Sequence, residues 1–211
     1  MNREDQLREM MARMLMAPAG SIDNGTSLAI LDNSLGEAKL HLGLKRLGLK
    51  LSPGVRPASF GELCRILAGN EPQSSGTARP MESPPRTSLA LDGLNVGLDV
   101  QEVSSLPAAL DFWEDEFYST TFGKAEIAYA LTKTEPRIHF AGFWCAKEAL
   151  RKCDPAFAGV EPHATTVAHE AGGRPYLVWS GSAGETRLHH AVSISHSGSI
   201  AAAIVVNHAR R

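Results

Sequence analysis

The hydrophobic pattern of the first 70 residues predicts three helices. The first is indicated by apolar side chains at helical spacing, preceded by acidic residues where the helix dipole favours them: Leu7, Met10, Met11, Met14 and Leu15. A second helix is predicted from Ser34 or Leu35 to Leu47, and Gly48 is a candidate for its C-cap. A third begins at Ser59, which has N-cap chemistry and is followed three residues later by a Glu. We therefore expect a small all-α domain.

A stretch without periodicity separates this region from the rest of the chain. Residues 70–88, NEPQSSGTARPMESPPRTS, are rich in Pro, Ser and Gly and almost free of large apolar side chains. Such a segment cannot form a packed element, so we interpret it as a linker. We predict a helical domain at residues 1–69, a linker at 70–90 and a second domain at 91–211, both domains being of ordinary size.

The second domain mixes strands and helices. Residues 94–103 alternate as a strand does, residues 112–122 favour a helix or turn, and residues 123–131 and 137–153 predict two more helices. PYLVWSG and HHAVSISHSGSIAAAIVVN favour strands, and the latter contains a hairpin turn near residues 197–198. Helices packed on a mostly antiparallel sheet define the fold class α+β.

Composition and charge restrict the classes of function. A chain of 211 residues with a net charge of −2 has no general affinity for nucleic acid or membrane. No segment reaches the roughly 20 apolar residues of a membrane span, and the charged N-terminus lacks the apolar stretch of a signal peptide. Cys64, Cys145 and Cys153 form neither a disulfide framework nor a metal-binding spacing. We therefore expect a cytoplasmic protein without nucleic-acid or membrane partners.

Three places in the second domain carry side chains that the predicted elements do not explain. Asp99 lies in a strand-like run where acidic residues are disfavoured, and Glu148 and Lys152 share one face of a helix. Ser195 and His196 interrupt an apolar strand pair. Each place also has an ordinary explanation. Asp99 could close a turn, Glu148 and Lys152 could form a solvated ion pair, and His196 could be a buried histidine with satisfied hydrogen bonds.

Two motifs occur here in the order and spacing of a known family. They are Gly97-Leu98-Asp99 and the helix WCAKEALRK at residues 144–152, supported by FGKAEIAYA, GGRPYL and AVSISHS. From Leu94 to Val206 the chain resembles the holo-acyl carrier protein synthases, the short class of 4′-phosphopantetheinyl transferases. The resemblance implies their fold, assembly as a homotrimer, and transfer of 4′-phosphopantetheine from coenzyme A to a serine of an acyl carrier protein.

The resemblance also implies roles for individual residues. Asp99 and Glu148 match two carboxylate ligands of Mg²⁺, an ion that prefers oxygen ligands and neutralises phosphate charge. Lys152 matches the lysine that neutralises or protonates the leaving phosphate. These three are the candidate catalytic residues. The candidate residues for binding coenzyme A are Lys147, Lys152, Gly173, Pro175, Ser195 and His196.

The chain departs from the family pattern at Phe143. Many relatives carry an Arg just before the aromatic residue of this helix, where it helps to hold the 3′-phosphate of coenzyme A. Arg137 and His139 are candidate replacements. The Gly-rich turn that often follows the family helix is replaced by residues 153–155, Cys-Asp-Pro.

The first domain resembles an acyl carrier protein. TSLAILDNSLGEAKLHLGLKRLGLKL has a loop, a serine that opens a helix and a Leu-rich helix, and carriers place the modified serine in Asp-Ser-Leu. Ser34, preceded by Asn33 and Asp32, is therefore a candidate site of phosphopantetheine attachment, which the enzyme could carry out on its own chain. An ordinary N-cap explains Ser34 equally well. The following helix is basic where that of carriers is usually acidic, which favours a vestigial or docking domain: Lys39, Lys45, Arg46 and Lys50.

A non-catalytic scaffold of a fatty-acid or polyketide synthase, keeping the fold without the reaction, is the alternative function. The joint presence of Asp99, Glu148 and Lys152 favours the enzyme, because a scaffold needs none of them.

Overall fold

The computed structural model describes residues 2–32, 34–52, 55–69 and 93–208. The chain divides into two compact units, Met1–Arg86 and Thr87–Arg211, each of which is described by itself. The predicted linker at residues 70–90 lies outside the described residues, so its boundaries stay a prediction. No helix in the described ranges is long and apolar enough to cross a membrane.

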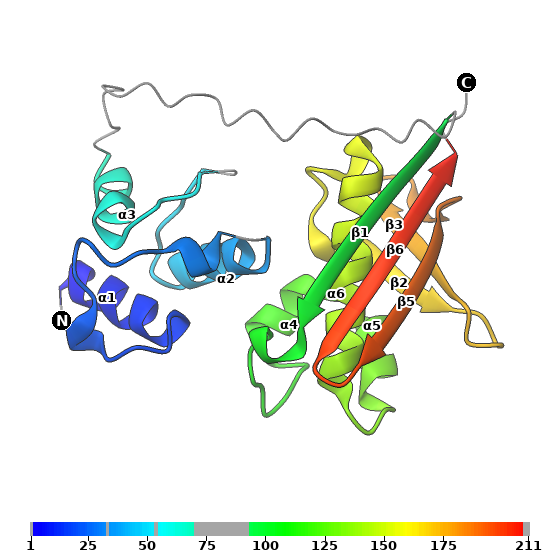
Figure 1. Ribbon diagram of the computed structural model, residues 1–211, viewed down its shortest axis with the longest axis horizontal. Helices are drawn as coiled ribbons and strands as arrows, with labels where there is room; N and C mark the ends of the chain where they lie inside the picture. The colour runs from blue at the N-terminus through cyan, green and yellow to red at the C-terminus, as the bar shows by residue number, and fades with distance from the viewer. Residues whose placement is uncertain (1, 33, 53–54, 70–92, 209–211) are drawn as a thin grey trace. The chain divides into compact units, whose positions relative to one another are not determined.

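The first unit is helical, as predicted (Figure 1). It contains α1 (Arg3–Met14), α2 (Ser34–Arg46) and α3 (Phe60–Leu67), with 3-10 turns at Ala19–Ser21 and Ala29–Leu31. The caps follow the sequence signals: the Ser59 hydroxyl accepts a hydrogen bond from the Glu62 amide at 3.3 Å, and Gly48 has a φ of 68°. The apolar faces of the helices meet in one core: Leu7, Met11, Leu28, Leu40, Leu44, Phe60 and Leu63.

The second unit is an α+β domain with two antiparallel three-stranded sheets, ordered β1-β6-β5 and β2-β3-β4. The helices and strands are β1 (Leu94–Glu102), α4 (Glu116–Thr121), α5 (Lys124–Leu131), α6 (Pro136–Cys153), β2 (Thr165–His169), β3 (Pro175–Gly181), β4 (Gly184–Arg187), β5 (Ala191–Ser197) and β6 (Ile200–His208). The predicted fold class is confirmed, but β2 and β4 were not predicted, and the expected single sheet is two.

Helix α6 is the centre of this unit. Every residue from Phe140 to Leu150 is buried, so all sides of the helix are covered. Strands β1, β6 and β5 pack along one side of α6, and α5 and β2 contact it elsewhere (Figure 1). Charged side chains on α6 therefore lie either in the interior of the unit or near one of the ends of the helix.

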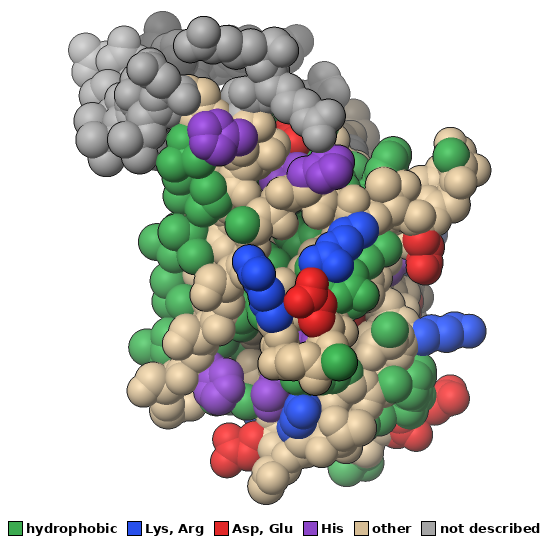
Figure 2. Space-filling model, turned by 90° about the vertical axis from the view of Figure 1, so that its right-hand side faces the viewer, with side chains coloured by type: hydrophobic (Ala, Val, Ile, Leu, Met, Phe, Trp, Pro, Cys, Tyr) green, Lys and Arg blue, Asp and Glu red, His purple; other side chains and the backbone are tan. Residues whose placement is uncertain are grey.

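The register of β1 and β6 gives their sheet two different faces. The face on α6 is buried and includes Gly97, Ala203 and Val205. The opposite face is apolar yet exposed: Leu98 pairs with Ile204, and both side chains are accessible. A column of hydrophobic side chains (green) runs down the left margin of Figure 2, which corresponds to the sheet face shown frontally in Figure 1. An uncovered apolar face of this kind is typical of a surface that binds another protein.

Candidate active site

Asp99 is held against α6 by a close approach of β1. A Cβ atom at Gly97 would lie 1.9 Å from the Ala149 carbonyl oxygen, so only glycine fits there. Two residues along the same strand face, Asp99 points to the same side. Asp99 lies inside the strand, paired with Ala203, so its interpretation as a turn residue is wrong.

The Asp99 carboxylate has one satisfied and one unsatisfied oxygen. Lys152 Nζ donates to Asp99 Oδ1 at 2.7 Å and to the Leu98 carbonyl at 3.1 Å. Asp99 Oδ2 is buried and, among the described residues, has no hydrogen-bond partner. The Asp99 carboxylate also acts on Cys145: burial raises the pKa of that thiol, and the charge of Asp99 raises it further. A buried, unpaired carboxylate oxygen is costly unless a cation or donor binds to it.

Glu148 lies one turn before Lys152 on α6 and is almost fully buried, with 5% of its surface exposed. Its Oε1 accepts a hydrogen bond from the Arg151 guanidinium at 3.0 Å. Glu148 and Lys152 thus have different partners, Arg151 and Asp99, so the solvated ion pair considered from their spacing is wrong. One strand and one helix thus supply two ion pairs, Asp99 with Lys152 and Glu148 with Arg151.

Lys147, assigned to coenzyme binding by resemblance, has structural partners instead. Its side chain is 1% exposed and forms an ion pair of 2.8 Å with Glu126, which is fully buried. The ammonium also donates to the carbonyls of Thr121, Pro162 and Thr165, which uses all its donors. Lys147 is therefore corrected from a coenzyme ligand to a structural residue.

Glu126 completes this buried centre, and the sequence reading gave it no role. Its Oε2 accepts from the Gly123 amide at 2.8 Å, and its Oε1 accepts from the Val167 amide at 2.9 Å. One carboxylate thus caps α5, anchors β2 and neutralises Lys147. The position of Glu126 in the first turn of a predicted helix was the available signal.

The remaining predicted coenzyme residues lie on β5 and at the β2–β3 turn. Ser195 and His196 are exposed on β5, so a buried role for His196 is wrong. Gly173 has a φ of 82° in the turn between β2 and β3, which favours glycine. Pro175 is the first residue of β3 and pairs with His169. The two groups come from different sheets.

The two candidates to replace the missing Arg differ in availability. Arg137 donates to the carbonyls of Val103 and Leu106, at 3.1 and 2.6 Å, so its guanidinium is occupied by backbone. His139 is partly accessible and its ring centroid lies 5.6 Å from that of His196. The structure favours His139 over Arg137 as a group that can contact a ligand.

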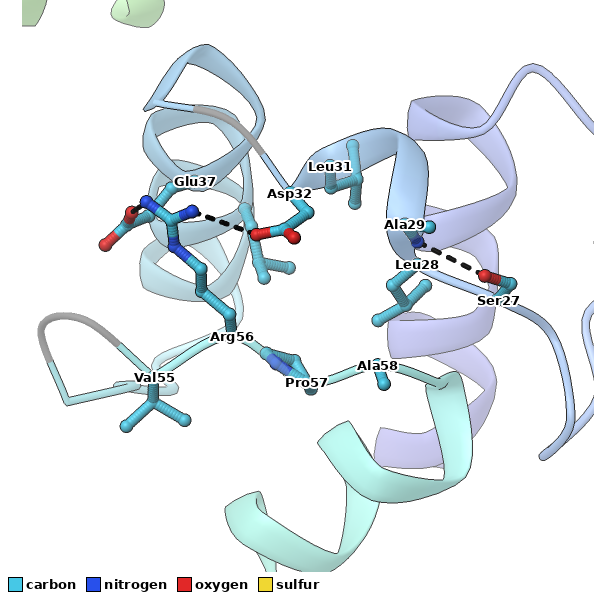
Figure 3. A pocket seen from close by; sticks show the side chains of 11 residues that line it. Ser27, Leu28, Ala29, Leu31, Asp32, Glu37, Val55, Arg56, Pro57 and Ala58 are labelled. Carbon is cyan, nitrogen blue, oxygen red and sulfur yellow. Dashed lines mark hydrogen bonds and ion pairs between the residues drawn. The ribbon is translucent and has the colours of Figure 1, made fainter. Parts of the chain in front are cut away.

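The first unit has a small cavity beside the start of α2. Its volume is about 200 Å³, and Arg56 lies across it, paired with Asp32 at 2.9 Å and with Glu37 at 3.3 Å (Figure 3). Ser34 is the first residue of α2, but its side chain lies outside the described residues. Attachment of phosphopantetheine at Ser34 therefore stays a prediction.

Comparison with known proteins identifies the family of the second unit. The model of the 4′-phosphopantetheinyl transferase superfamily matches residues 95–205. The chain belongs to that superfamily. The matched segment runs from β1 to β6 and contains the whole site around Asp99 and Glu148. The predicted enzyme class, a phosphopantetheinyl transferase of the holo-acyl carrier protein synthase type, is confirmed.

The individual proteins to which the chain is similar differ in how much of it they cover. A holo-[acyl-carrier-protein] synthase of Solidesulfovibrio magneticus is 40% identical over 120 residues, covering 53% of this chain and 94% of that protein. A fatty acid synthase alpha subunit, pigJ of Monascus ruber, is 25% identical over 210 residues, covering 93% of this chain and 11% of that protein. The structure titled as an ACPS–CoA complex of Chronobacterium ammoniagenes has 25% identity and a TM-score of 0.45, covering 56% of this chain and 98% of that one.

Proposed function

We propose that this transferase moves 4′-phosphopantetheine from coenzyme A to a serine of an acyl carrier protein, with Mg²⁺ as its metal. The observation that carries the proposal is the 2.7 Å contact of Lys152 with Asp99 where β1 contacts α6, with the buried Glu148 one helical turn before Lys152, within the segment that matches the family. The names of the relatives, holo-[acyl-carrier-protein] synthases, support the acceptor.

The residues present fit a magnesium ion. Carboxylate oxygens are its preferred protein ligands, and it is usually bound by one or two carboxylates together with phosphates and waters. In the described part of the chain Asp99 Oδ2 is buried without a hydrogen-bond partner, and Glu148, one helical turn before the Lys152 that pairs with Asp99, is a second buried carboxylate. The described residues hold no group of three or more His, Cys, Asp or Glu suited to a metal, in keeping with a two-carboxylate site. Bound there, Mg²⁺ would neutralise the diphosphate of coenzyme A.

The chain's own residues supply the remaining chemistry. The carrier serine oxygen attacks the phosphorus attached to pantetheine, and the bond from that phosphorus to the bridging oxygen breaks. The serine proton passes to a carboxylate of the Asp99–Glu148 pair acting as general base. Lys152 is half exposed beside Asp99, so its ammonium can offset the charge that develops on the leaving adenosine 3′,5′-bisphosphate.

We propose further that the transferase forms a homotrimer through the exposed face of β1 and β6. The contiguous apolar residues Val96, Leu98, Val100 and Ile204 support this, because they would be costly to leave in water. We expect the wild-type chain to have a trimer mass by light scattering, and Leu98→Lys to have a monomer mass. Leu110→Lys, which alters an exposed leucine outside this sheet, is the matched control and should stay trimeric. A monomeric wild type would refute this assembly.

The first unit is proposed as an acceptor on the same chain, with Ser34 as the modified residue. Support comes from its helical fold and from the position of Ser34 at the first residue of α2. After incubation with coenzyme A and Mg²⁺, we expect the intact mass of the chain to rise by one phosphopantetheine. The gain should be lost in Ser34→Ala. Full modification of the Ser34→Ala chain would place the acceptor elsewhere.

The same mass measurement on a separate apo-carrier protein tests the proposed function itself. A gain of one phosphopantetheine on that carrier, dependent on coenzyme A, is expected whether or not Ser34 is modified. Retained binding of coenzyme A without transfer to any of several carriers would contradict the proposal and favour a scaffold.

A further inference from the structure

Three basic side chains of the second unit contact one tyrosine, Tyr129, and a fourth contacts one of these three. Lys133 follows α5, while His139, His169 and His196 come from α6, β2 and β5. The His169 ring stacks on Tyr129 with centroids 4.1 Å apart and planes 4° apart, and Lys133 Nζ lies 4.2 Å from the Tyr129 centroid. Low on the face shown in Figure 2, histidine side chains (purple) lie beside a basic side chain (blue) and an acidic one (red).

The rings form one continuous cluster. His139 lies 6.0 Å from Tyr129 and 5.6 Å from His196 between centroids. The ring centroid of Phe143 lies 6.0 Å from that of His169 and 5.9 Å from that of Tyr129, so Phe143 packs against both rings. We call Lys133, His139, His169 and His196 the basic cluster. The β2–β3 turn lies next to it, since His169 pairs with Pro175.

The basic cluster contains repulsion that a ligand would relieve. Burial lowers the pKa of His139, and the three other members of the cluster lower it further. Burial also lowers the pKa of His169, as does Lys133. The charged groups that act on these two rings, among the described residues, are thus all basic. Structural histidines are usually paired with a carboxylate or carbonyl, so a cluster of this composition is suited to an external anion.

A metal ion is the alternative ligand for several histidines, and the structure argues against it. In the described part of the chain, no set of three or more His, Cys, Asp or Glu is arranged to hold a metal. Lys133 would also repel a cation at this place, whereas an ammonium and several imidazoles are common partners of phosphate.

We propose that the basic cluster binds the terminal phosphate monoester of the donor, which for coenzyme A is its 3′-phosphate, and that this contact depends on pH. The inference rests on the proposed function. It assigns phosphate recognition to Lys133 and His169, which had no role, together with His139, and explains how the chain can carry Phe143 where many relatives have Arg. Because imidazoles bind the anion only when protonated, the contact weakens as pH rises through their pKa values.

The test compares the affinity for coenzyme A with that for 3′-dephospho-coenzyme A, by titration calorimetry on the full chain. At pH 6.5 we expect coenzyme A to bind at least about tenfold more tightly, since charge-assisted hydrogen bonds are the strong ones. At pH 8.5 the ratio should fall toward the contribution of Lys133 alone. The affinity for the dephospho compound should stay nearly constant, which separates the cluster from the rest of the site.

The double substitution His139→Gln with His169→Gln should lower the affinity ratio at pH 6.5 to the contribution of Lys133 and His196. His189→Gln, which alters an exposed histidine outside the cluster, is the matched control and should keep the wild-type ratio. If the double variant fails to fold, the test is an NMR pH titration of the histidine ring resonances in the wild type. Coenzyme A should raise the pKa of His139 and His169, and the dephospho compound should not.

The outcomes distinguish a failure of this inference from a failure of the proposed function on which it rests. If both compounds bind equally, or the ratio does not change with pH or in the double variant, the basic cluster has no role in phosphate recognition and the transferase proposal stands. If neither compound binds, the proposed function fails and this inference fails with it.

Discussion

Glu148→Gln and Asp99→Asn are each expected to lower the rate of carrier modification by at least about a thousandfold. Both remove a negative charge from the proposed metal site while preserving shape. A catalytic metal supplies several kcal/mol of transition-state stabilisation, and each 1.36 kcal/mol corresponds to about a tenfold change in rate. The measurement is the initial rate of mass gain on a separate carrier with saturating coenzyme A and Mg²⁺.

The control for this loss is Glu170→Gln, which removes a carboxylate from an exposed ion pair with Arg187. Its rate should equal that of the wild type. Binding of Mg²⁺ gives a second readout: the ion should raise the melting temperature of the wild type but not of Asp99→Asn. A folded Glu148→Gln or Asp99→Asn protein with near-normal activity would show that the carboxylates are not metal ligands.

Lys147→Met is expected to destabilise the second unit by about 3–5 kcal/mol, the usual cost of leaving one member of a buried ion pair unpaired. The substitution leaves the Glu126 carboxylate in an interior where both side chains are at most 1% exposed. It also leaves three carbonyls without their donor. We expect urea unfolding, followed by tryptophan fluorescence, to shift to lower concentration. Trp113, Trp144 and Trp179 all lie in the second unit, so the signal reports on it alone.

Two further variants make this result specific. Adding Glu126→Gln to Lys147→Met should restore part of the stability, because the unpaired charge disappears. Arg187→Met, at the exposed pair with Glu170, should leave the urea midpoint close to that of the wild type. A loss below about 1 kcal/mol in Lys147→Met would mean that Lys147 is not a structural residue, and would reopen its assignment to coenzyme binding.

The elements with strong periodicity could be predicted from the sequence, and those without it could not. Polar and apolar residues alternate clearly along β1, and the apolar residues of α6 recur at helical spacing, so both elements were predicted. Strand β4 has four exposed residues, GETR, so it has no buried side chains to mark it. Strand β2 is five residues long, too short for its period to stand out. The division into two sheets depends on tertiary packing between distant segments, which no local pattern contains.

Only part of the candidate site could be predicted from the sequence. The motif around Gly97 and Asp99 has a local physical cause, since a side chain at residue 97 would collide with α6. The partner of Lys147 could not be found in the same way, because Glu126 is 21 residues away on another helix. Spacing put Glu148 and Lys152 on one face, yet Lys152 pairs with Asp99, 53 residues earlier in the chain. Pairings of this range are set by packing.

The central claim is that the chain transfers phosphopantetheine and does not merely bind a donor or a carrier. The most direct measurement follows two products in one reaction: adenosine 3′,5′-bisphosphate released from coenzyme A, and the mass gain of a separate apo-carrier. We predict that both form at the same rate in a ratio of one to one, and that both stop when Mg²⁺ is chelated. Release of the nucleotide without a gain on the carrier, or neither product with coenzyme A bound, would contradict the account.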